Sequence, residues 1–216
     1  MVLTDGMFSQ NGEIAPLKAY LRILPEAACI LVDDAHGAGV LGKTGRGTLE
    51  EQGVDRTRII QTIALSKAFG VYGGAVLCNR TMAARIQTRS RLFNGNTPLP
   101  LPLVNAALAA VQVLRADKTL RRRLRENTDY VKSVLRKVGF PIPKTPAPIV
   151  SLAPVRAQEI AQLKKQFAAQ GVYPSFIKYP GGPANGYFRF ALSSEHTRAQ
   201  LDAFLKVLVS HLRMGA

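Results

Sequence analysis

The sequence has few of the residues that build disulfide scaffolds and metal sites: its 216 residues include two cysteines and three histidines. It also lacks tryptophan. Two cysteines, both inside apolar runs, are too few for a disulfide framework or a zinc site. No apolar run approaches the roughly 20 residues that a transmembrane helix needs. The first residues lack the basic and apolar blocks of a signal peptide, so we expect a cytoplasmic protein with no membrane partner.

Acidic residues are also scarce: 14 Asp and Glu face 29 Lys and Arg, for a formal net charge of +15. The basic surplus is concentrated between residues 80 and 137. Such a surplus attracts polyanions, either nucleic acid or a phosphorylated small molecule. No RNA-binding aromatic pattern, zinc finger or helix-turn-helix signature accompanies the charge, so we do not expect a nucleic-acid partner.

Hydrophobic patterning predicts a mostly parallel α/β sheet in the first part of the chain. Three apolar runs alternate with turn-rich connections, and each is continuous enough for a strand covered on both faces: 28–35, 59–65 and 73–79. Helical spacing then extends over 103–137, as one long helix or two in tandem.

A second, smaller unit follows the proline-rich connection at 141–148. Its pattern predicts these strands and helices, in order: strand 149–153, helix 156–170, strands 172–177 and 187–192, and helix 197–213. The last helix begins at a capping signal, Thr197 followed by Gln200. We therefore divide the chain into a large α/β part (1–108), a linking helix (109–140) and a small α+β domain (141–216).

Residues 37–44 match the G-x-x-x-x-G-K-T pattern of a phosphate-binding loop and follow an apolar run. Such a loop must pass directly into a helix whose N-terminus faces the anion. Here Gly45 and Gly47 stand where the first helical turn should form, and the acidic pair Asp33–Asp34 precedes the loop. We therefore reject a nucleotide triphosphatase.

Asp33 and His36 follow one predicted strand, and Lys67 follows the next. Because the carboxyl ends of neighbouring parallel strands meet at one crevice, these side chains should converge. A carboxylate, an imidazole and an amine suit pyridoxal 5'-phosphate, which needs a Schiff-base lysine and a partner for its ring nitrogen. Taken on spacing alone, a turn cap, a loop histidine and a surface lysine remain an open alternative.

Four blocks of the sequence resemble the C-terminal signature blocks of the α-oxoamine synthases, in order and spacing: DGMFSQNGEIAPL (5–17), VDDAHGAGVLGKTGRGT (32–48), LSKAFGVYGGAV (65–76) and FRFALSSEHT (188–197). These fold-type I pyridoxal-phosphate enzymes include the 8-amino-7-oxononanoate synthases and glycine C-acetyltransferases. The resemblance implies the C-terminal half of the cofactor-binding large domain followed by the small domain. We expect the N-terminal half, with its phosphate-binding glycines, to lie outside this chain.

The resemblance also implies roles for individual residues. Lys67 would be the Schiff-base lysine and the base that takes the α-proton, and Asp33 would pair with the ring nitrogen. His36 would bind the ring hydroxyl oxygen, and Ser9 would line the same pocket. Arg189 would bind the substrate carboxylate, a task that suits its bidentate fork.

One departure concerns the cofactor phosphate. The family usually has Ser or Thr three residues before the lysine, where this chain has Ala64. Thr97 is then a candidate for the phosphate site, contributed across a dimer interface.

The implied activity is a decarboxylating condensation of an amino acid with an acyl-CoA, resembling 8-amino-7-oxononanoate synthase, by a homodimer and with no metal. A truncated fragment of such an enzyme is included in this expectation. Two alternatives remain: a pyridoxal-phosphate aminotransferase of class I/II, and an inactive basic binding module.

Overall fold

The computed structural model describes residues 1–93, 95–154, 156–179 and 182–215. The chain forms two compact units. Unit 1 consists of Met1–Phe8 and Ile14–Lys118, and unit 2 of Ser9–Glu13 and Thr119–Ala216. The predicted linking segment 109–140 is therefore shared between the two units.

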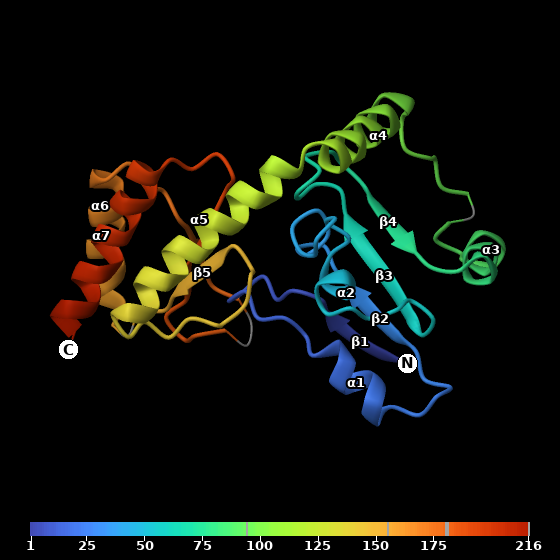
Figure 1. Ribbon diagram of the computed structural model, residues 1–216, viewed down its shortest axis with the longest axis horizontal. Helices are drawn as coiled ribbons and strands as arrows, with labels where there is room; N and C mark the ends of the chain where they lie inside the picture. Colours follow the sequence, from blue (N-terminus) through green and yellow to red (C-terminus); the bar gives the residue numbers. More distant parts are fainter. Residues whose placement is uncertain (94, 155, 180–181, 216) are drawn as a thin grey trace. The chain divides into compact units, whose positions relative to one another are not determined.

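Unit 1 contains a four-stranded sheet with its strands in chain order (Figure 1). The strands are β1 (Val2–Asp5), β2 (Ile30–Asp33), β3 (Ile59–Ala64) and β4 (Gly74–Leu77). Strands β1, β2 and β3 are parallel, whereas β4, which was predicted from the run 73–79 as part of a mostly parallel sheet, runs antiparallel to β3. The short connection explains the reversal, because a parallel crossover needs a dozen or more residues. The amide of Leu65 already donates to the Gly73 carbonyl at 2.9 Å.

One face of this sheet is packed and the other is partly open. Leu17 of α1 (Leu17–Ile23) and Leu49 of α2 (Thr48–Glu51) pack with Ile30, Val32 and Ile59 on the packed face. The opposite face carries Val76 of β4, which is 48% exposed. The prediction that each apolar run is covered on both faces is therefore wrong for the run 73–79, within the described part of the chain.

Two helices complete the main elements of unit 1. Helix α3 (Arg80–Arg89) begins at Asn79, whose side-chain oxygen accepts a hydrogen bond from the Met82 amide at 2.8 Å. Helix α4 (Leu101–Ala116) is apolar, yet none of its side chains is buried. No helix in the described part of the chain is long and apolar enough to span a bilayer.

Unit 2 is built on a three-stranded antiparallel sheet of β5 (Ile149–Leu152), β7 (Tyr187–Ala191) and β6 (Ser175–Ile177), in that order. Its helices are α5 (Lys118–Lys137), α6 (Ala157–Ala169) and α7 (Arg198–Gly215). The long helical pattern thus resolves into two helices in tandem, α4 and α5.

Aromatic side chains fill the core of unit 2. The ring of Phe167 packs against those of Phe188 and Phe190 at centroid distances of 5.9 and 5.0 Å. The predicted start of α7 is confirmed by reciprocal hydrogen bonds: the Thr197 amide donates to Gln200 Oε1 at 2.9 Å, and the Gln200 amide to Thr197 Oγ1 at 3.3 Å.

Candidate functional site

Two consecutive carboxylates at the end of β2 have different environments. Side chains alternate between the faces of a strand, so neighbouring residues point in opposite directions. Asp33 is exposed, whereas Asp34 is completely buried. The sequence Asp33–Asp34 therefore supplies one carboxylate that can meet a ligand and one that serves the fold.

Asp34 organises the glycine-rich loop that follows it. Its carboxylate accepts hydrogen bonds from the amide and hydroxyl of Thr48, at 2.8 and 2.6 Å, and from Gln61 Nε2 at 2.7 Å. Burial raises the pKa of Asp34, and the hydrogen bonds from Thr48 and Gln61 counter part of that rise. The carboxylate joins the loop to β3.

Three glycines make room for the Asp34 carboxylate. A Cβ at Gly37 or Gly47 would lie 2.1 or 2.0 Å from a carboxylate oxygen, and one at Gly6 would lie 2.5 Å away. Gly47 also has a φ of +90°, which a residue with a side chain adopts only under strain. These glycines are thus explained by packing around a buried acid.

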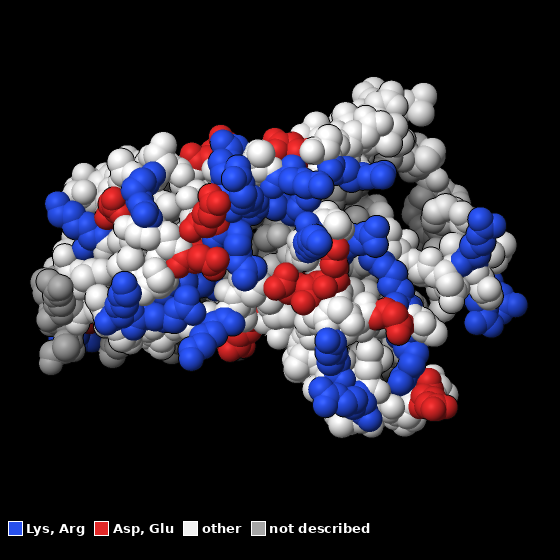
Figure 2. Space-filling model, viewed as in Figure 1, with Lys and Arg blue, Asp and Glu red and all other residues white. Residues whose placement is uncertain are grey.

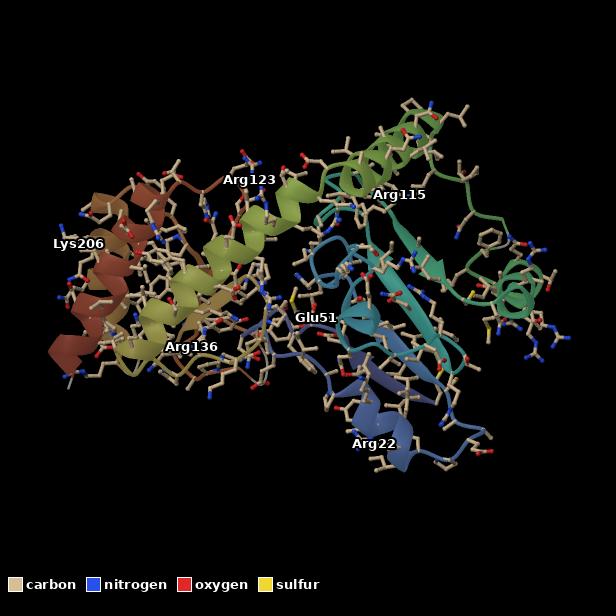
Figure 3. The ribbon with its side chains drawn as sticks, viewed as in Figure 1. Arg22, Glu51, Arg115, Arg123, Arg136 and Lys206 are labelled. Atoms are coloured by element: carbon tan, nitrogen blue, oxygen red, sulfur yellow. The ribbon has the colours of Figure 1, made fainter. Side chains whose placement is uncertain are left out.

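The loop itself is held by acidic side chains. The Glu50 carboxylate accepts from the amides of Thr44 and Arg46, each at 3.0 Å, and Glu51 accepts from the Gly42 amide at 3.0 Å (Glu51 is labelled in Figure 3). Burial alone would raise the pKa of Glu50. Hydrogen bonds from Arg46 and Thr44 outweigh this effect, so the pKa of Glu50 is lowered. These are the amides that a phosphate loop would offer to phosphate. The geometry agrees with rejecting that interpretation.

Asp33 lies beside a second carboxylate and an imidazole. Asp5 in β1 is its register partner, and the Ala35 amide donates to Asp33 Oδ1 at 3.0 Å, which fixes the turn. Burial raises the pKa of Asp5, the charge of Asp33 raises it further, and His36 lowers it. Asp33, His36 and Asp5 therefore share one electrostatic environment at the carboxyl edge of the sheet.

Lys67 lies in the short loop between β3 and β4, at the same edge. Its side chain is exposed and forms no hydrogen bond or ion pair with the residues that the structure describes. The loop packs against the glycine-rich loop, since a Cβ at Gly39 would lie 2.7 Å from the Cβ of Ala68. The residue after Lys67 thus touches the loop that carries His36.

The other predicted residues are distributed over both units. Thr97 is an exposed residue of unit 1, before α4. Ser9 and Arg189 belong to unit 2. The structure therefore brings Asp33, His36 and the Lys67 loop together in unit 1, and places Ser9 and Arg189 in the other unit.

Arg189 lies on β7, the central strand of its sheet, between Ser151 and Ser175. It lines a cavity of about 370 Å³ together with Tyr173, His196 and apolar residues including Phe204. Arg189 is half-buried, and within the described part of the chain its guanidinium forms no hydrogen bond or ion pair. A guanidinium at a cavity is suited to binding an anionic group.

Sequence reasoning missed Asp5 and the structural role of Asp34. The register between β1 and β2 reveals Asp5, and that register cannot be read from the sequence alone. The sequence did hold an indication that Asp34 has a structural role, because this acid is followed by a loop with several glycines. Among the described residues, no group of three or more His, Cys, Asp and Glu is arranged to hold a metal.

Comparison with known proteins agrees with this geometry. An 8-amino-7-oxononanoate synthase from Fervidobacterium nodosum is 34% identical over 204 residues, which cover 94% of this chain and 52% of that protein. The crystal structure of the 8-amino-7-oxononanoate synthase from Francisella tularensis matches with a TM-score of 0.88 and 28% identity, over 100% of this chain and 63% of the other. The chain spans about half the length of the curated relatives it matches.

A second solved structure is similar over the same extent. A serine palmitoyltransferase from S. paucimobilis, solved with a bound PLP–myriocin aldimine, matches with a TM-score of 0.85 and 28% identity over 99% of this chain and 55% of the other. The predicted fold class, part of a fold-type I α/β large domain with a small α+β domain, is confirmed. The sequence pattern of one family matches residues 1–208. The chain belongs to the aminotransferase class I and II family.

Proposed function

We propose that this chain is part of a pyridoxal-phosphate-dependent C-acyltransferase of the 8-amino-7-oxononanoate synthase type. The reaction joins an amino acid to an acyl-CoA and releases CO₂ and free coenzyme A. The observation that carries the proposal is the packing of the Lys67 loop against the loop that follows Asp33 and His36. The proposal includes a cytoplasmic location, in keeping with Cys29 and Cys78, which form no disulfide.

The residues at this edge fit pyridoxal phosphate in their chemistry. An exposed carboxylate at the end of β2, an imidazole in the loop that follows it and an exposed amine in the adjoining loop all belong to unit 1. Gly39 leaves room for the Lys67 loop to approach, because any larger residue would meet Ala68. When bound, the cofactor supplies an electron sink for reactions at the α-carbon of an amino acid.

The side chains of the chain then have separate tasks. Asp33, fixed by the Ala35 amide, would hold a proton on the ring nitrogen, and His36 would bind the ring hydroxyl oxygen. Lys67 Nζ would anchor the cofactor and accept the α-proton of the amino acid. Arg189 would bind the α-carboxylate through its two-pronged guanidinium.

The phosphate group of the cofactor cannot take its hydrogen bonds from the glycine-rich loop. Three of that loop's amides already donate to Glu50 and Glu51. Ala64 offers no hydroxyl, so Thr97 is the proposed contributor from this chain. Other donors would come from outside these 216 residues.

Reduction with borohydride tests the cofactor site. The 216-residue chain would be incubated with pyridoxal phosphate, reduced, digested and mapped by mass spectrometry. We expect the label on Lys67, its loss in Lys67→Ala, and its retention in Lys43→Ala, which removes another exposed lysine. Absent label, or label spread over several lysines of the folded chain, would contradict the proposal.

Product analysis separates the condensing enzyme from the aminotransferase. An amino acid and a panel of acyl-CoA thioesters would be added, and free coenzyme A thiol measured. Thiol release that depends on the amino acid supports condensation. A keto acid formed without thiol release would indicate transamination, and neither product would indicate an inactive module.

We also propose that the working enzyme is a homodimer. Helix α4 supports this proposal, since Leu101 and Leu108, seven residues apart and therefore on one face of the helix, are 77% and 57% exposed. Exposed apolar residues on one helix face are typical of a surface that another chain covers. Leu108→Glu should lower the sedimentation coefficient from that of a dimer, whereas Arg89→Glu in α3 should not.

The basic stretch is proposed to attract coenzyme A, whose phosphates are anionic. Basic side chains gather along α5, where Arg123 and Arg136 are labelled (Figures 2 and 3). Arg123 pairs with Glu195 at 2.6 Å, so part of this charge already has a partner. If reversing the charge of Arg121, Arg122 and Arg123 leaves the dependence on acyl-CoA unchanged, the stretch is only a solvated face.

A further inference from the structure

Residues 9–13 belong to unit 2, although the chain on both sides of them belongs to unit 1. An isolated antiparallel bridge between Met7 and Ile14 closes the base of this excursion. The Ala15 amide also donates to the Gly6 carbonyl at 3.0 Å. The segment is therefore the tip of a tight hairpin whose base is part of unit 1.

Two side chains of unit 2 bind the carbonyls of this tip. The Thr145 hydroxyl donates to the Gly12 carbonyl at 2.6 Å, and the Ser151 hydroxyl donates to the Gln10 carbonyl. Gly12, with a φ of +77°, is buried against Ala147 and Ile149, whose Cβ atoms would lie 3.0 and 3.2 Å from an added Cβ. The tip is thus both packed and hydrogen-bonded.

A buried lysine orients one of these hydrogen bonds. Lys132 is 1% exposed, and its Nζ donates to the carbonyl and the hydroxyl oxygen of Thr145, at 3.0 and 3.3 Å. Because an ammonium group only donates, the Thr145 hydroxyl must accept from it and is left with its own proton for Gly12. Burial, and next the charge of Arg136, lower the pKa of Lys132 to about 8.

The anchored tip adjoins residues with proposed roles in binding. Ser151 is the register partner of Arg189, the proposed carboxylate ligand. Ser9, the proposed cofactor-pocket residue, is the first residue of the tip. The hydrogen bonds from Thr145 and Ser151 therefore lie close in the chain or in the sheet to Ser9 and Arg189.

We propose that residues 9–13 form a tether whose anchoring by Thr145 and Ser151 positions Ser9 on the unit that carries Arg189. This inference rests on the proposed function. Thr145, Ser151 and Lys132 are positioning residues, since they act through the tether and do not touch the substrate. Release of the tether should displace Ser9 and weaken binding of the cofactor, while Lys67 stays the residue that captures it.

Glutamyl-specific proteolysis measures release of the tether without any cofactor. Glu13 is exposed within the tether, and exposed Glu26 provides an internal reference in unit 1. The isosteric change Thr145→Val should raise cleavage after Glu13, relative to cleavage after Glu26, by about tenfold. Ser151→Ala should act in the same direction, and Thr145→Ser should restore the wild-type ratio.

Thr128→Val is the matched control, because the Thr128 hydroxyl donates only within α5, to the Leu124 carbonyl at 2.7 Å. It should leave the cleavage ratio unchanged. An unchanged ratio in both Thr145→Val and Ser151→Ala would overturn the tether. Wild-type urea midpoints for the variants would confirm that the effect is local.

Cofactor binding then tests the positioning role. Pyridoxal phosphate would be titrated into the chain, and the labelling of Lys67 after reduction would be measured at each concentration. Thr145→Val should raise the half-saturating concentration of pyridoxal phosphate about tenfold, with Lys67 still the labelled residue. Faster cleavage with unchanged cofactor binding would overturn positioning and leave a purely structural clasp. No labelling of wild-type Lys67 would refute the proposed function and the positioning role with it, while the cleavage ratios still decide whether the tether exists.

Discussion

Replacing the adjacent acids Asp33 and Asp34 one at a time should show that Asp34 contributes to stability and Asp33 to cofactor binding. Asp34→Ala removes the acceptor of the Thr48 amide, of the Thr48 hydroxyl and of one N–H of Gln61 Nε2, which keeps its second hydrogen bond, to the Arg46 carbonyl at 3.2 Å. Each unpaired donor costs about 1–3 kcal/mol, and relief of the buried charge offsets part of the sum, so we expect a net loss of about 4 kcal/mol. Asp34→Asn keeps one acceptor oxygen and should cost about 2 kcal/mol.

Asp33→Asn is the control for this change, because Asp33 is exposed and an amide oxygen can still accept from Ala35. Its stability should change by less than about 0.5 kcal/mol, while labelling of Lys67 by pyridoxal phosphate falls sharply. Hydrogen exchange of the β2 and β3 amides, which are ladder-bonded, reports the stability of unit 1. An Asp34→Ala protein within about 1 kcal/mol of wild type would refute the assigned role of the buried carboxylate.

Three further changes test other parts of the structure. Gly39→Ala should cost about 2 kcal/mol, because φ is +81° and the new Cβ meets Ala68, and should reduce labelling of Lys67. Lys132 has a pKa of about 8 in the folded chain and an ordinary value of 10.5 in the unfolded chain, so the unfolded chain binds more protons and stability rises with pH between those values. Urea titrations should show that Lys132→Met lacks this rise, of about 3 kcal/mol. Arg189→Lys, which keeps the charge but loses the fork, should weaken amino-acid binding at least about tenfold with unchanged labelling of Lys67.

The secondary structure of this chain was largely predictable, because its apolar runs are bounded by glycine and proline. The antiparallel direction of β4 was also predictable, since the connection between the runs 59–65 and 73–79 is too short for a parallel crossover. Exposure of one sheet face could not be predicted. A continuous apolar strand has the same sequence whether or not its second face is covered, as Val76 shows.

The spacing of residues along the chain predicted which side chains of the site lie together when they follow the same strand. Asp33 and His36 were placed together because both follow one strand, and the pKa of Asp5 reports both charges. Contacts that join distant segments were out of reach, such as Thr145 with Gly12, 133 positions apart. In the glycine-rich loop the contacts come from residues nearby in the sequence. Glu50 and Glu51, just after the motif, accept hydrogen bonds from the amides that the motif would otherwise present to a phosphate.

The excursion of residues 9–13 has a consequence for the order of folding. The hydroxyls that bind these residues, on Thr145 and Ser151, are synthesised more than a hundred residues after them. Such distant contacts form late, because a long loop must close before they contribute. Unit 2 is therefore completed by a piece of chain synthesised before nearly all of unit 1, and a fragment that begins at Thr119 would lack it.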